Sequence, residues 1–333
     1  MMEHRMEQST TILTVKNLRK YFAVRGGLLQ TVQAHVKAVD GVSFSVGEGE
    51  TLGIVGETGC GKSTLGKAII GVLPPGTKVR GQLRLRGNDL LHMPESQLQQ
   101  IRGRDLALIF QDPMTRLDPM MTIEKHFIET IRSHERVSDE EARGRAVRVL
   151  ASMGIAENRL RSYPHEFSGG MRQRIMIAMA LVMNPSMLIA DEPTTALDVI
   201  VEAQILDILR ELREAFKMSL VLITHNLAIV AETCDRVAVM YAGKLVEVGG
   251  VMDVFKRPIH PYTQGLLASL IHLDSKKLSS IDGLPPDLID PPSGCRFHPR
   301  CRFAQAVCIR EEPRLEEYRP GQIAACHFGR DFL

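Results

Sequence analysis

Length, composition and charge limit the classes of protein to which this chain can belong. Its 333 residues are 44% hydrophobic and 24% charged, a composition that excludes collagen-like, low-complexity and wholly disordered chains. Lysine and arginine number 41 against 39 for aspartate and glutamate, so the net charge is too small for a dedicated nucleic-acid-binding protein. At about 150 residues per domain, two domains are expected.

No apolar run is predicted to cross a membrane. The longest, residues 175–183, ends at Asn184 and Pro185 and is far shorter than the roughly 18 to 20 residues of a spanning helix. Residues 1–11 lack the basic and apolar regions of a secretory signal. We therefore expect a cytosolic chain whose six cysteines are reduced.

Short apolar runs alternate with helical patterns along the chain. Alternating patterns predict antiparallel strands at residues 13–15, 38–46 and 82–86. Continuous apolar runs predict buried parallel strands at 51–55, 106–110, 187–190 and 220–224. Helices are predicted at 62–72, 138–153 and 204–217, and residues 90–165 form a mainly helical subdomain. The predicted fold class is α/β, with an antiparallel β subdomain and a helical subdomain.

The last part of the chain has a different pattern. After His260 the periodicity fades, and Pro-Pro pairs at 285–286 and 291–292 interrupt the sequence. This change predicts a main domain over residues 12–258 and a small C-terminal regulatory or interaction domain over 259–333. Four cysteines fall in the extension, at Cys295, Cys301, Cys308 and Cys326.

Four thiolates in a segment with little apolar core could bind a metal that holds the segment together. The intervening gaps of 5, 6 and 17 residues suit a larger cluster better than zinc, whose paired ligands are usually about two to four residues apart. A cluster, a zinc ion and free thiols are the alternatives. Cys60 and Cys234 are predicted to pack in the core.

The string G-E-T-G-C-G-K-S at residues 56–63 matches the phosphate-binding loop, and it lies between a predicted strand and a predicted helix. Its glycines allow backbone N–H groups to face phosphate oxygens, Lys62 reaches the outer phosphates and Ser63 can hold Mg²⁺. The residues predicted to contact the nucleotide here are Gly56, Glu57, Thr58, Gly59, Cys60, Gly61, Lys62, Ser63 and Thr64.

A second strand, residues 187–190, leads into Asp191 and Glu192. Both carboxylates should lie at the carboxyl edge of the sheet, as the phosphate loop does. Asp191 is predicted to coordinate Mg²⁺ through water. Glu192 is predicted to polarise the water that attacks the γ-phosphoryl group.

Ser168, Gly169 and Gly170 precede an apolar helix, and they form a second helix N-terminus suited to phosphate. One chain cannot easily bring two such termini to one triphosphate. With the motifs above, this string resembles the signature of the ATP-binding-cassette (ABC) family over roughly residues 12–258. The resemblance implies a P-loop NTPase fold of the ABC type that binds ATP and Mg²⁺ and hydrolyses ATP.

The same resemblance assigns further residues. Gln111 matches the glutamine loop, which also contacts Mg²⁺, Asp198 the aspartate loop and His225 the switch histidine. Phe22, with Tyr21 beside it, matches the aromatic position that stacks on adenine. In this family two nucleotide-binding domains close head to tail, which implies a second ATPase subunit, identical or homologous.

The strings His260-Pro261-Tyr262-Thr263-Gln264 and Gln111-Asp112-Pro113-Met114 resemble those of importer ATPases of the oligopeptide, dipeptide and nickel group. This resemblance implies peptide import, two transmembrane permease subunits, an extracellular peptide-binding protein and a peripheral position on the cytoplasmic face of the membrane. It also implies a 4Fe-4S cluster at the four late cysteines. Nickel or another small solute as cargo, and a non-transport ABC ATPase, are the alternatives; no nucleic-acid partner is expected.

Overall fold

The computed structural model describes residues 11–27, 31–74, 77–111, 116–194, 199–269 and 281–333. The chain divides into two units, of which the first comprises Met1–His92 with Leu222–Leu333 and the second Met93–Val221. Within these described ranges, no helix has both the length and the apolar character needed to span a membrane.

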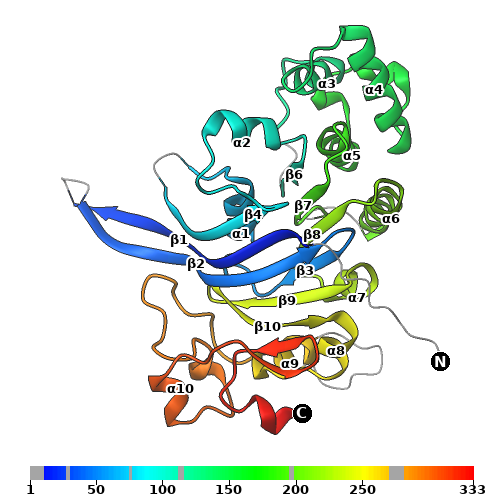
Figure 1. Ribbon diagram of the computed structural model, residues 1–333. Coiled ribbons are helices and arrows are strands. Elements are labelled where there is room, and N and C mark those ends of the chain that lie inside the picture. Colours follow the sequence, from blue (N-terminus) through cyan, green and yellow to red (C-terminus); the bar gives the residue numbers. More distant parts are fainter. Residues whose placement is uncertain (1–10, 28–30, 75–76, 112–115, 195–198, 270–280) are drawn as a thin grey trace. The chain divides into compact units, whose positions relative to one another are not determined.

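A four-stranded antiparallel sheet begins the first unit, in the order β2-β1-β4-β5. Two long strands, β1 (Thr11–Gly26) and β2 (Thr31–Gly47), pair along their length and are the blue arrows of Figure 1. They are followed by β4 (Val79–Leu85) and the short β5 (Asn88–Asp89). The predicted antiparallel subdomain is therefore confirmed, but β1 and β2 extend well beyond the predicted strands.

The first unit also contains the strand order β11-β12-β10-β9-β3. The five-residue β3 (Thr51–Val55) is fully buried and runs parallel to β9 (Arg236–Tyr241), as continuous apolar runs predict. An antiparallel hairpin joins β9 to β10 (Lys244–Gly250). β12 (Gln322–Ala324) pairs with β10, and β11 (Glu316–Arg319) with β12. The end of the chain thus extends this sheet.

In the described part of the first unit, α-helices pack beside these strands. α1 (Lys62–Ile70) follows β3 and the phosphate loop, and α7 (Leu227–Thr233) precedes β9. The C-terminal part contributes α8 (Val251–Lys256), α9 (Pro261–Ala268) and α10 (Ala306–Arg310). Tyr241 of β9 packs with Tyr262 and Phe297 of this part in an aromatic cluster, and all three are at most 3% exposed.

The second unit contains parallel strands and most of the long helices. β6 (Leu106–Ile109) pairs with β7 (Met187–Asp191), and the chain returns to the first unit through β8 (Ser219–Ile223). The helices are α2 (Glu95–Ile101), α3 (Ile123–Arg132), α4 (Asp139–Ser152), α5 (Gly169–Leu181) and α6 (Val199–Phe216). The strands predicted at 106–110, 187–190 and 220–224 are therefore confirmed within one or two residues.

Local sequence explains where α4 begins and which face it buries. Ser138 caps the helix by accepting a hydrogen bond from the N–H of Glu141 at 3.2 Å, and the first turn is acidic. Ala142, Ala146 and Leu150 recur every fourth residue and are fully buried.

Candidate active site

The phosphate loop lies between β3 and α1 in the first unit, and two of its glycines cannot be replaced. Gly56 and Gly61 have φ angles of 154° and 110°. A Cβ atom would lie 2.1 Å from the Met240 carbonyl oxygen at Gly56 and 2.0 Å from that of Ala38 at Gly61. The loop can therefore follow this path only because both positions lack a side chain.

Lys62 occupies the first turn of α1 and is 4% exposed. Its ammonium group donates hydrogen bonds to the carbonyl oxygens of Gly56 at 2.7 Å and Glu57 at 3.1 Å. No side chain caps the N-terminus of α1 at Gly61, so the positive end of the helix is left for an anion. This arrangement is suited to a polyphosphate.

The predicted catalytic carboxylates follow β7 in the second unit. Asp191 is 1% exposed, whereas Glu192 is half-buried and has a left-handed φ of 47°. The side-chain amide of Gln111 donates to a carboxylate oxygen of Glu192 at 3.3 Å. The structure thus brings Gln111 and Glu192 together at the ends of adjacent parallel strands. A non-glycine residue in the left-handed region is a feature that often accompanies function.

The Ser168-Gly169-Gly170 string forms the start of α5. Ser168 is the N-cap and accepts from the N–H of Met171 at 3.4 Å. Ser168 and Gly169 are exposed, while the preceding Phe167 is 3% exposed and anchors the string. This helix N-terminus therefore faces solvent, where another molecule can reach it.

The remaining predicted nucleotide contacts differ in how the structure places them. Phe22 is half-buried, and the Lys20 ammonium nitrogen lies over its ring, 4.5 Å from the ring centroid. Neighbouring Tyr21, predicted together with Phe22, has its hydroxyl hydrogen-bonded to Asp40. His225 follows β8 and is exposed, and Asp198 lies outside the described residues.

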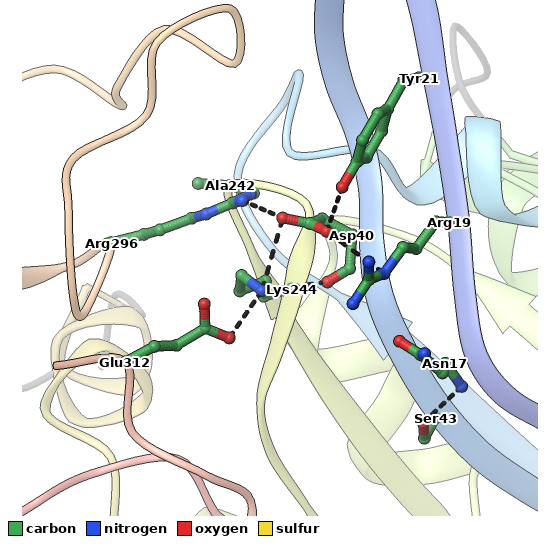
Figure 2. A network of polar contacts seen from close by, with 9 residues as sticks. All are labelled: Asn17, Arg19, Tyr21, Asp40, Ser43, Ala242, Lys244, Arg296 and Glu312. Atoms are coloured by element: carbon green, nitrogen blue, oxygen red, sulfur yellow. Dashed lines mark hydrogen bonds and ion pairs between the residues drawn. The ribbon is translucent and has the colours of Figure 1, made fainter. Parts of the chain in front are cut away.

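Tyr21 belongs to a polar network around Asp40 (Figure 2). Its hydroxyl donates to Asp40 at 2.5 Å, Arg296 pairs with the same carboxylate, and Lys244 lies 3.5 Å from it. Burial opposes ionisation of Asp40, but the Tyr21 hydrogen bond and both cations outweigh it and lower the carboxyl pKa. Burial, then the hydrogen bond to Asp40, raises the pKa of Tyr21 to about 12. This network joins β1 and β2 to the C-terminal part of the chain.

The four late cysteines line a single cavity. Its lining is otherwise largely aromatic and includes Phe297, Phe303, Phe328 and Phe332. Burial raises the pKa of Cys295 to about 11 and that of Cys326 to about 12, so these thiols are neutral at pH 7 when no metal binds them. In the part of the chain that the structure describes, no three or more His, Cys, Asp or Glu side chains are placed to hold one metal ion.

The other two cysteines are packing residues. Cys60 is 6% exposed, and a Cβ atom added at Gly53 would lie 3.0 Å from the Cys234 sulfur. Both side chains therefore fill space around β3, which agrees with the prediction from sequence.

A buried carboxylate fixes the start of the C-terminal part. Glu247 on β10 is 0% exposed and accepts from the backbone N–H groups of Ile259 and His260, both at 2.9 Å. The side-chain amide of Gln322 on β12 donates to it at 2.9 Å. Sequence analysis missed Glu247 and Gln322, because each contacts residues that are distant in the chain.

His260 is the N-cap of α9 and is 1% exposed. Its Nδ1 accepts from the N–H of Tyr262 at 3.0 Å, and burial lowers its pKa from 6.5 to about 3. Between these pH values the unfolded chain binds a proton that the folded chain does not. The His260 contribution to the free energy of unfolding should therefore decrease as the pH falls below 6.5, by on the order of 1 kcal/mol for each pH unit.

This linkage predicts the effect of His260→Asn, which keeps a capping side chain and removes the titration. The variant should be less stable than wild type at pH 7, because the smaller side chain leaves space in the core. The melting temperatures of the variant and of wild type should become more similar when the pH is lowered from 7 to 5. The exposed His35 provides a control, His35→Asn. The prediction would be contradicted if the difference in melting temperature between His260→Asn and wild type were the same at pH 5 as at pH 7.

Two protein-family profiles match the chain. An ABC transporter profile matches residues 39–195. A profile of the oligopeptide/dipeptide transporter C-terminal region matches residues 246–308, which include Glu247, His260 and three of the four late cysteines.

Curated relatives match along nearly the whole chain. The oligopeptide transport ATP-binding protein OppD of Escherichia coli is 45% identical over 324 residues, which cover 96% of this chain and 94% of OppD. The dipeptide transport ATP-binding protein DppD of Bacillus subtilis is 48% identical over 308 residues, which cover 91% of this chain and 90% of DppD.

Solved structures show the same fold. The ATP-binding cassette MJ0796, described as a dimer in a post-hydrolysis state bound to ADP and Pi, is 26% identical with a TM-score of 0.63. The match covers 72% of this chain and 98% of that one. The predicted P-loop fold of the ABC type is therefore confirmed. The chain belongs to the ABC transporter ATPases, in the group of oligopeptide and dipeptide transport ATP-binding proteins.

Proposed function

We propose that this chain is the ATP-hydrolysing subunit of an ABC transporter that imports dipeptides or oligopeptides. The observation that carries the proposal is the match to peptide-transport ATP-binding proteins over both the ATPase part and the C-terminal region. The proposal is also supported by the ordered phosphate loop, with its Lys62 contacts, and by the contact between Gln111 and Glu192.

The predicted residues divide between nucleotide binding and hydrolysis. Residues 56–64 bind the phosphates through backbone N–H groups and the Lys62 ammonium, and Phe22 stacks on adenine. Glu192 accepts the proton of the attacking water, and the amide of Gln111 orients its carboxylate. His225 contacts the γ-phosphate. Ser63, Gln111 and Asp191 would hold Mg²⁺, which neutralises charge on the phosphates.

The exposed N-terminus of α5 supports a site shared between two ATPase subunits. Ser168, Gly169 and Gly170 would contact ATP bound to the phosphate loop of the opposing subunit, with Asp198 at the same junction. The dimeric state of the MJ0796 cassette supports this arrangement. The opposing subunit is identical or homologous.

The proposal also includes the rest of the transporter. The cassette, residues 12–258, would dock on two transmembrane permease subunits at the cytoplasmic face of the membrane, and an extracellular peptide-binding protein would deliver cargo to them. Residues 259–333 form the C-terminal regulatory or interaction domain.

Reconstitution tests the transport function. The chain would be placed with its permeases and its second ATPase subunit in lipid vesicles, and phosphate release would be measured. The binding protein loaded with peptide should raise the rate of ATP hydrolysis above that with empty binding protein. Stimulation by a nickel chelate but not by any peptide would contradict the proposed cargo, and full activity without membrane subunits would favour a non-transport ATPase.

We propose, further, that the four late cysteines hold a 4Fe-4S cluster. The four cysteines are not grouped for a single metal ion, and the support for a cluster is that all four line one cavity with largely aromatic walls, because a protein shell of this kind excludes water. When bound, the cluster would supply cross-links among segments of the extension. Cys295, Cys301, Cys308 and Cys326 would be the ligands.

The cluster and the alternatives differ in colour and composition. Protein purified without oxygen should be brown and contain about four iron and four sulfide per chain. Cys301→Ser should remove the visible absorption, while the control Cys234→Ser should retain it. A colourless preparation with one zinc per chain would contradict the cluster, and one with neither metal would leave free thiols.

A further inference from the structure

Glu57, inside the phosphate loop, is held by the C-terminal extension. The two terminal nitrogens of Arg300 donate to its two carboxylate oxygens at 2.7 Å and 3.0 Å, in a bidentate ion pair. The backbone N–H of Glu57 donates to the Tyr262 hydroxyl at 2.9 Å. These partners lie 243 and 205 residues further along the chain. The extension therefore fixes both the main chain and the side chain of one loop residue.

Arg300 is itself held in place. Its side chain is 6% exposed, against 23% for Glu57. Its Nε donates to the carbonyl oxygen of Asp282 at 2.9 Å, and one terminal nitrogen also donates to that of Ile281 at 3.3 Å. These contacts fix the orientation of the guanidinium group toward Glu57.

Tyr262 is equally constrained. It is 0% exposed and packs against Tyr241 and Phe297, whose ring centroids are 4.5 Å and 5.4 Å away. Phe297 also lines the cavity of the four cysteines. The hydroxyl that receives the Glu57 N–H thus extends from a rigid aromatic cluster of the C-terminal part.

We propose that Arg300 and Tyr262 are positioning residues through which the extension sets the affinity of the phosphate loop for MgATP. This inference rests on the proposed ATPase function. Arg300 neutralises a carboxylate within the loop that must accept the negative charge of the phosphates. Both contacts also order the loop before the nucleotide arrives. The entropy cost of ordering the loop therefore does not reduce the free energy of nucleotide binding.

Neither residue is assigned contact with the reacting atoms, which predicts a specific kinetic pattern. Arg300→Gln should weaken MgATP binding about tenfold, the usual effect of losing one charge-assisted contact. The KM for ATP should rise with it, while kcat at saturating ATP changes by less than about twofold. Tyr262→Phe keeps the ring and loses only the hydroxyl that accepts from the Glu57 N–H. It should also raise the KM for ATP with little change in kcat, but by less than Arg300→Gln does.

A double variant separates positioning from a merely structural role. In Arg300→Gln the Glu57 carboxylate is left without its cation and repels the phosphates. Adding Glu57→Gln removes that charge, so Arg300→Gln with Glu57→Gln should bind MgATP more tightly than Arg300→Gln alone. A structural ion pair alone predicts no such recovery. Affinities would be measured with a fluorescent ATP analogue, and melting temperatures recorded beside them.

Arg302→Gln is the matched control, because Arg302 is exposed and lies against the Phe303 ring. It should bind MgATP as wild type does. The proposal is overturned if wild type binds MgATP and Arg300→Gln binds it equally well, even where its melting temperature falls. If wild type itself bound no nucleotide, the proposed function would fail, and this inference would fail with it.

Discussion

Replacing Glu192 by Gln is expected to slow ATP hydrolysis about 10²- to 10⁴-fold, the usual contribution of a positioned general base. The amide cannot accept a proton from the attacking water, yet it has nearly the same shape as the carboxylate. Affinity for MgATP should therefore be retained. Because hydrolysis normally ends the closed state, dimers with bound ATP should accumulate. Phosphate release and gel filtration with ATP measure the two effects.

The control for this variant is Glu129→Gln on α3. Glu129 is exposed, and it is assigned no role at the nucleotide. Its replacement should leave the rate of hydrolysis unchanged. Normal turnover by Glu192→Gln would show that another group activates the water, and the assignment of Glu192 as the general base would be wrong.

Replacing Lys62 by Ala is expected to impair nucleotide binding itself. The buried ammonium now donates to two loop carbonyl groups, and the same group would donate to phosphate oxygens when ATP binds. The loss of charge-assisted hydrogen bonds should weaken binding about 10- to 100-fold. Titration with a fluorescent ATP analogue measures this change. Lys67→Ala, on the same helix but outside the loop, should bind normally; equal affinities of Lys62→Ala and wild type would contradict the assignment.

The parts of the fold that were predicted from sequence are those with strong local signals. β3 and β7 are short, continuous apolar runs, and α4 has a serine cap and a regular apolar face. β1 and β2 were predicted too short. The C-terminal half of β1 and the N-terminal half of β2 are largely exposed, so buried and exposed residues alternate only weakly there. The pairing of β12 with β10 was not predicted, since a three-residue strand has almost no periodicity and its partner lies far along the chain.

The same distinction applies to the candidate site. The phosphate loop and the start of α5 are contiguous strings, and their chemistry is readable from residue type and order. Glu57 was predicted only as a member of its loop, because its partners Tyr262 and Arg300 come from a segment without regular periodicity. Asp40 and Arg296 form a buried pair that no local pattern indicates. Long-range pairs of this kind depend on the folded topology.

ATP-dependent uptake of a labelled peptide tests the proposed function most directly. Vesicles would contain the permeases, both ATPase subunits and, outside, the binding protein, with ATP enclosed inside. Wild-type chain should support accumulation of the peptide, and Glu192→Gln should reduce the initial rate by at least about tenfold while the complex remains assembled. Equal uptake with both chains, or uptake that does not require ATP, would contradict the claim that hydrolysis at this site drives peptide import.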